Sequence, residues 1–90
     1  MMYLSLVEYF HGVQSRLPEE AERVIKSLED IGPMNKEDLS LTAKVKRAVL
    51  DHVVMQLYAL GIVDVNTEGK SKICSLTKLG YDFLSLKNAV

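Results

Sequence analysis

The sequence predicts an α+β fold that is mainly α-helical, with a core of three helices, a two-stranded β-hairpin after them, and an extra helix at each end. Three observations support this prediction. Apolar residues recur at helical spacing through most of the first 60 positions, two short segments that are β-branched or alternating follow Gly61, and a charged turn with a glycine separates them. We expect a single domain over residues 1–90, because a chain of this length buries one core unaided.

The first two predicted helices come from apolar stripes with recognisable ends. The first spans about residues 2–14, and its apolar stripe is formed by Tyr3, Leu4, Leu6, Val7, Phe10 and Val13. The second begins at Pro18, because proline suits a first helical position and the glutamates after it oppose the positive end of the helix dipole. Gly32 and Pro33 end this helix. Its buried face is expected to contain Ala21, Val24, Ile25, Leu28 and Ile31.

A helix–turn–helix pair is expected next. Asn35 is a good N-cap residue, so a short third helix is predicted over about residues 36–41. A turn then follows, because the hydroxyl of either Ser40 or Thr42 can cap a fourth helix over about residues 42–60. The apolar stripe of this fourth helix is formed by Leu50, Val53, Val54, Leu57 and Leu60.

The remaining elements are a hairpin and a last helix. Residues 62–65 and 72–76 are β-branched or alternating, and the polar segment 66–71 between them has turn chemistry. We therefore expect two antiparallel strands. Thr77 is expected to cap a last helix over about residues 78–87.

The formal net charge of −1 conceals an asymmetry along the chain. Residues 1–43 contain eight acidic and four basic residues, a net charge of −4, whereas residues 44–80 contain six basic and three acidic residues, a net charge of +3. Such an asymmetry points to a polyanionic partner for the basic half. A solvated surface of mixed charge explains the same pattern, because six bases are few.

Several classes of function are not expected. Metalloprotease, phosphate-loop and dinucleotide-binding motifs are absent, and one cysteine, Cys74, cannot form a disulfide within the chain. The residue types of a thiol triad occur in Cys74, His52 and Asp51, but sequence does not place them together, and a buried inert thiol is the simpler interpretation. We therefore expect no enzyme, no cofactor and no metal site. The apolar N-terminal stretch does not resemble a signal peptide and is too short to cross a membrane, so a cytoplasmic protein is expected.

Three phrases occur in an order that resembles the winged helix-turn-helix transcriptional regulators of bacteria and archaea, of the MarR, ArsR and PadR type. The phrases are IGPMNKEDL at residues 31–39, LYALGIV at residues 57–63 and LTKLG at residues 76–80. The resemblance covers about residues 17–86. It implies a winged-helix core over about residues 17–76, in which the hairpin is the wing.

The resemblance implies a small DNA-binding protein, a transcriptional regulator that binds double-stranded DNA as a homodimer. The helix over about residues 42–60 would enter the major groove, and the wing at residues 66–72 would reach an adjacent groove or phosphate. Lysine and arginine bind phosphates, and amide, imidazole or carboxylate groups can contact base edges. The candidate DNA-binding residues are Lys44, Lys46, Arg47, Asp51, His52, Gln56, Lys70 and Lys72.

Several features of the sequence leave alternatives open. The outer face of the fourth helix has few base readers, and Asp51 repels phosphate even if it accepts a hydrogen bond from cytosine. The exposed stripe of Ala48, Met55 and Ala59 fits a protein-interaction module or an accessory subunit without direct DNA binding. His52 is more simply explained as a surface histidine without a role. The N-terminal helix either covers the core or mediates the dimer.

Overall fold

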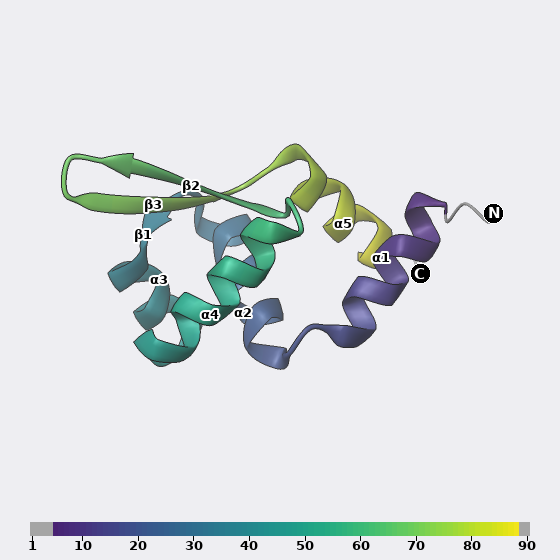
Figure 1. Ribbon diagram of the computed structural model, residues 1–90, viewed down its shortest axis with the longest axis horizontal. Helices are drawn as coiled ribbons and strands as arrows, with labels where there is room; N and C mark the ends of the chain where they lie inside the picture. The colour runs from purple at the N-terminus through teal and green to yellow at the C-terminus, as the bar shows by residue number, and fades with distance from the viewer. Residues whose placement is uncertain (1–4, 89–90) are drawn as a thin grey trace.

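The computed structural model of the chain describes residues 5–88. Within these residues it forms five helices and three strands (Figure 1). In chain order the elements are α1 (Leu6–Arg16), α2 (Glu19–Ile31), β1 (Met34–Asn35), α3 (Lys36–Ala43), α4 (Arg47–Ala59), β2 (Val63–Glu68), β3 (Ser71–Leu76) and α5 (Lys78–Asn88). The predicted mainly helical α+β fold is therefore confirmed. Each of these five helices stops short of the length and apolarity that a membrane crossing requires.

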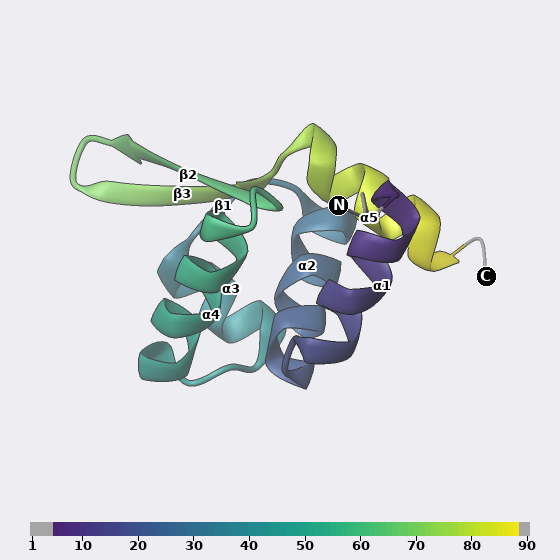
Figure 2. The ribbon, with the colours of Figure 1, turned by 45° about the vertical axis from the view of Figure 1, so that its right-hand side comes forward.

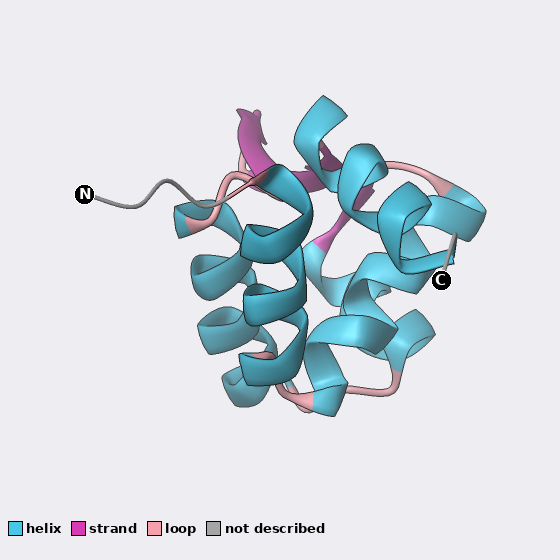
Figure 3. Cartoon of the chain, turned by 90° about the vertical axis from the view of Figure 1, so that its right-hand side faces the viewer, coloured by secondary structure: helices cyan, strands magenta, loops and turns pink. Residues whose placement is uncertain are grey.

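The molecule is elongated, about 44 × 23 × 22 Å, with the hairpin at one end and the pair α1 and α5 at the other (Figures 1 and 2). Viewed down the long axis, the strands lie along one edge and the helices fill the rest (Figure 3).

Phe10 of α1 and Phe83 of α5 are buried and meet edge to face, with ring centroids 5.2 Å apart. Two residues predicted in the first stripe, Tyr3 and Leu4, lie outside the described residues.

The sheet has three antiparallel strands in the order β1-β3-β2, not the two that were predicted. The extra strand contains only Met34 and Asn35, too few residues to produce an alternating pattern in the sequence. The hairpin strands are also longer than predicted, and the turn consists of Gly69 and Lys70 alone. Gly69 adopts a φ of 60°, which glycine tolerates without strain. Polar residues that resembled a turn therefore pair along the wing, because backbone pairing does not require apolar side chains.

The turn between α3 and α4 is the main correction to the sequence prediction. Helix α3 continues to Ala43, and α4 begins at Arg47 rather than near residue 42. Ser40 and Thr42 do not cap α4; the Ser40 hydroxyl instead donates to the carbonyl of Val45 at 2.6 Å. Ala43 and Val45 are both buried, so packing of these two side chains extends α3 and draws the turn into the core.

A second contact fixes this turn from α2. The Nε of Arg23 donates to the carbonyl of Ala43 at 3.1 Å, and Lys44 ends α3 in the left-handed conformation with a φ of 57°. The N-cap prediction at the other end of α3 is confirmed, because the Asn35 side chain accepts from the backbone amide of Asp38 at 2.8 Å. One predicted core residue, Ile31, is 65% exposed, since α2 extends past the core at this end.

The base of the wing is held by a cluster that we call the wing-base junction: Gly61, Ile62, Thr77 and Gly80. The Thr77 hydroxyl accepts from the amide of Gly80 at 3.0 Å, which confirms the predicted cap of α5, and donates to the carbonyl of Gly61 at 2.5 Å. The backbone amide of Thr77 donates to the carbonyl of Ile62. A Cβ on Gly80 would collide with that same carbonyl, so only glycine fits there.

Candidate nucleic-acid interface

An open depression of about 370 Å³ lies where the N-terminal ends of α3 and α4 approach the wing. We call it the basic basin, because four basic and two acidic side chains line it and leave a local excess of positive charge. The lining residues are Asn35, Lys36, Glu37, Arg47, Asp51, Lys70, Ser71 and Lys72. Helix starts and the hairpin tip therefore bring bases from three separate segments together.

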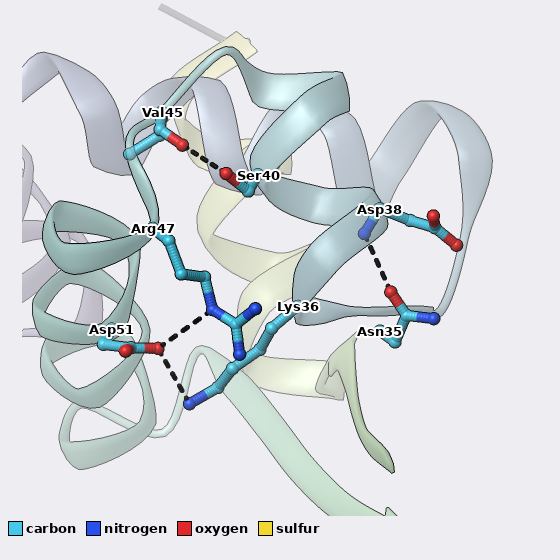
Figure 4. A network of polar contacts seen from close by, with 7 residues as sticks. All are labelled: Asn35, Lys36, Asp38, Ser40, Val45, Arg47 and Asp51. Atoms are coloured by element: carbon cyan, nitrogen blue, oxygen red, sulfur yellow. Dashed lines mark hydrogen bonds and ion pairs between the residues drawn. The ribbon is translucent and has the colours of Figure 1, made fainter.

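A carboxylate joins two of the bases (Figure 4). Asp51 Oδ1 accepts a hydrogen bond from Lys36 Nζ at 3.2 Å and lies 3.6 Å from Arg47 Nε. Lys36 comes from α3, whereas Arg47 and Asp51 lie one turn apart on α4. The hydrogen bond from Lys36 and the nearby positive charges hold the pKa of the Asp51 carboxyl below its ordinary value, so this side chain is ionised at neutral pH.

The start of α4 differs from the starts of the two helices before it. Helices α2 and α3 have acidic residues in their first turns, as the helix dipole favours. Helix α4 has none: Lys46 precedes it, Arg47 opens it, and no side chain caps its amides. Uncapped amides, the positive end of the dipole and two bases together favour an external anion such as phosphate.

Four of the eight predicted DNA-binding residues line the basin: Arg47, Asp51, Lys70 and Lys72. Lys36 also lines it and was missed, because its partner Asp51 lies 15 residues further along the chain and no local pattern connects them. The one signal available was its place directly after the N-cap Asn35, within the phrase IGPMNKEDL of the resemblance.

The other four predicted residues lie elsewhere. Lys44 belongs to the turn after α3, not to the start of α4, and borders a separate depression with Glu19, Glu22 and Arg23. Lys46 is exposed at the N-cap of α4. His52 and Gln56 are exposed on α4 but do not line the basin. They are available to a ligand that covers the helix, together with the exposed stripe of Ala48, Met55 and Ala59.

The structure does not assemble the thiol triad. Cys74 is fully buried in the central strand, and burial raises the pKa of its thiol. His52 is exposed, and Asp51 is paired with Lys36 and Arg47. Across residues 5–88, no three histidine, cysteine or acidic side chains are grouped as a metal site would require.

Comparison with known proteins finds similarity in structure. No protein-family model and no curated protein sequence matches the chain. TubR from Bacillus thuringiensis serovar israelensis pBtoxis, bound to 24 bp of tubC, is 18% identical with a TM-score of 0.78, over 99% of this chain and 98% of that one. A MarR family transcriptional regulator from Silicibacter pomeroyi DSS is 19% identical with a TM-score of 0.77, over 86% and 54%. The transcriptional regulator PA4135 is 27% identical with a TM-score of 0.73, over 91% and 65%.

These similarities define the class of the fold. The chain has the winged-helix fold of MarR-like and TubR-like transcriptional regulators, with α2, α3 and α4 as its three-helix core and β2 and β3 as its wing. It spans nearly the whole of TubR but only about half of the Silicibacter regulator and 59% of RV1404 from Mycobacterium tuberculosis.

Proposed function

We propose that the chain is a small winged-helix protein of the cytoplasm that binds double-stranded DNA and regulates transcription. The observation that carries the proposal is the basic basin, which joins the uncapped, basic start of α4 to Lys70 and Lys72 of the wing. The similar structures support it, because one is TubR bound to 24 bp of tubC and another is the transcriptional regulator PA4135. The neighbours give no support to the alternative of a protein-interaction module.

Backbone contacts would supply most of the affinity. Protein–DNA complexes direct half or more of their hydrogen bonds to phosphate and sugar, and the basin offers lysine and arginine for this purpose. With α4 in the major groove, the exposed side chains of His52 and Gln56 would face base edges, whereas Met55 would offer only apolar contact and Asp51 lies in the basin. The proposed binding mode is therefore strong in phosphate contacts and sparse in base readout.

We further propose that the protein acts as a homodimer through α1 and α5. Apolar side chains are exposed on these helices, at the end opposite the wing: Val7 is 43% exposed, Tyr9 37% and Tyr81 49%. Burial of these side chains between two copies would leave both basic basins free. Dimers of this kind place two recognition helices roughly 34 Å apart, one turn of DNA.

Fluorescence anisotropy with duplex DNA tests the binding proposal. Affinity should fall steeply with salt, and Lys70→Ala should reduce the slope of log affinity against log salt by about one, since one phosphate contact is lost. Arg16→Ala is the matched control, because it removes the same charge from α1, far from the basin. An affinity that does not depend on salt would exclude the proposal.

Sedimentation analysis tests the dimer separately. Tyr9→Asp places a charge among the exposed apolar side chains of α1 and should convert a dimer into monomers. Ile31→Asp is the control, because Ile31 is an exposed apolar residue, 65% accessible, at the end of α2 instead. A wild-type protein that sediments as a monomer at high concentration would contradict this part of the proposal.

A further inference from the structure

The basic basin already contains an anion of its own. We propose that Asp51 competes with DNA phosphate for the basic side chains of the basin, so that it limits the affinity for the DNA backbone. The proposal rests on the proposed function, since it concerns the regulation of the same site. It starts from the shared contact on Asp51 Oδ1, which lies 3.2 Å from Lys36 Nζ and 3.6 Å from Arg47 Nε.

A carboxylate oxygen and a phosphate oxygen are equivalent acceptors for ammonium and guanidinium groups. Asp51 therefore occupies the position that a phosphate oxygen would take between Lys36 and Arg47. Its side chain is 51% exposed, so the negative charge also faces the path of an approaching backbone. Because the carboxyl pKa is lowered, this charge persists through the neutral range.

The two bases are held differently. The Lys36 side chain is only 14% exposed and donates a hydrogen bond to Asp51, which is its sole ion-pair partner among residues 5–88. The Arg47 side chain is 56% exposed, and its longer contact has little stability of its own. Arg47 is thus the group that exchanges partners when a phosphate arrives, while Lys36 remains with Asp51.

This exchange has a consequence for affinity. Each phosphate contact made through Arg47 first breaks an internal contact, and Asp51 then stays beside the bound phosphate and repels it. Binding to DNA of any sequence is thereby weakened by the same amount, so the total affinity falls while the difference in binding free energy between two sequences stays the same.

The test measures anisotropy of a mixed-sequence DNA duplex against salt for Asp51→Asn. This variant should bind about fivefold more tightly, with a slope about one unit steeper, since one more base meets phosphate. Two controls remove the same charge. Glu37→Gln removes an acidic side chain of the basin that makes no ion pair, and Asp82→Asn removes an exposed one from α5. Both should leave the slope unchanged.

A double-mutant cycle locates the effect. If Arg47 is the released group, the gain from Asp51→Asn should disappear in an Arg47→Ala background. Should Asp51→Asn fail to fold because Lys36 loses its partner, the double variant Lys36→Gln with Asp51→Asn removes both charges, and its gain in affinity reports Arg47 alone.

The outcomes separate the two proposals. Wild-type protein that binds with salt dependence, combined with an Asp51→Asn variant that binds no more tightly, would overturn the competition and leave the proposed function intact. In that case Asp51 positions Arg47 or contacts a base. Absence of salt-dependent binding in every variant would overturn both. Tighter binding that survives Arg47→Ala would contradict the assignment of Arg47 as the exchanging group.

Discussion

The wing-base junction and the basic basin lie at the two ends of the same hairpin and are built in opposite ways. At the junction, Thr77 bonds to two segments at once and Gly80 packs against a carbonyl that excludes any side chain. At the basin, bases from three segments gather around one carboxylate, and most of their side chains are exposed. The junction is tightly packed, whereas the basin retains an excess of positive charge that its own carboxylates do not fully balance.

Most of the motifs in the sequence correspond to the wing-base junction rather than to the basic basin. Two of the three phrases behind the resemblance, LYALGIV and LTKLG, contain the junction residues Gly61, Ile62, Thr77 and Gly80. In this chain they encode the closure of the wing against the end of α4. All of the basin residues lie outside these two phrases, so these two motifs predict the fold much better than they predict the ligand.

The largest effect that distinguishes the two regions is expected at Gly80. A Cβ there meets the Ile62 carbonyl and the Leu76 side chain, and backbone cannot yield as a flexible side chain can. Overpacking of this kind costs more than the helix propensity of alanine returns, so Gly80→Ala should lower the free energy of unfolding by about 2 kcal/mol. Chemical denaturation provides the measurement.

Gly12 of α1 is the matched control, because nothing lies within contact distance of a Cβ at that position. Gly12→Ala should raise the free energy of unfolding by up to about 1 kcal/mol, as expected for a helix interior. Equal responses from the two glycines would show that the packing at the junction is looser than the structure indicates.

An intermediate effect is expected at Thr77. Thr77→Val keeps the shape of the side chain but removes the hydroxyl that accepts from Gly80 and donates to Gly61. Loss of the cap and of the bridge should lower stability by about 1–2 kcal/mol in a thermal melt. Thr67→Val, at an exposed position of β2, should change stability by less than about 0.5 kcal/mol. If Thr67→Val lowered stability more than Thr77→Val, the contacts that stabilise the wing would lie within its strands and not at the wing-base junction.

The smallest effect belongs to the basin and depends on pH. The folded-state pKa of Asp51 is depressed below the ordinary value of 3.8, so its ion pairs stabilise the fold above that pH, and this contribution disappears as pH falls through the folded-state pKa. Because both pairs are partly exposed, the contribution should not exceed about 1 kcal/mol. Denaturant titrations of wild type and Asp51→Asn should therefore differ at neutral pH and converge in acid. Curves that remain parallel down to strong acid would contradict the ion pairs.

The sequence predicted the features that depend on near neighbours. Asn35 and Thr77 were identified as caps because each bonds to an amide three residues away. The end of α3 was placed too early because it depends on burial of Ala43 and on Arg23, which lies 20 residues upstream. Lys36 was missed for the same reason, since its contact with Asp51 connects two helices. Tertiary contacts of this range leave no local pattern.

The left-handed residue at the end of α3 is a lysine, Lys44, rather than a glycine. The left-handed backbone conformation costs lysine roughly 1 kcal/mol more free energy than glycine. The contact from Arg23 and the burial of Val45 hold Lys44 in this conformation. Lysine therefore supplies a positive charge at this position at the expense of backbone strain. Lys44→Gly would relax the backbone and remove the positive charge in one step. At this position, a substitution that raises stability also makes the protein less cationic.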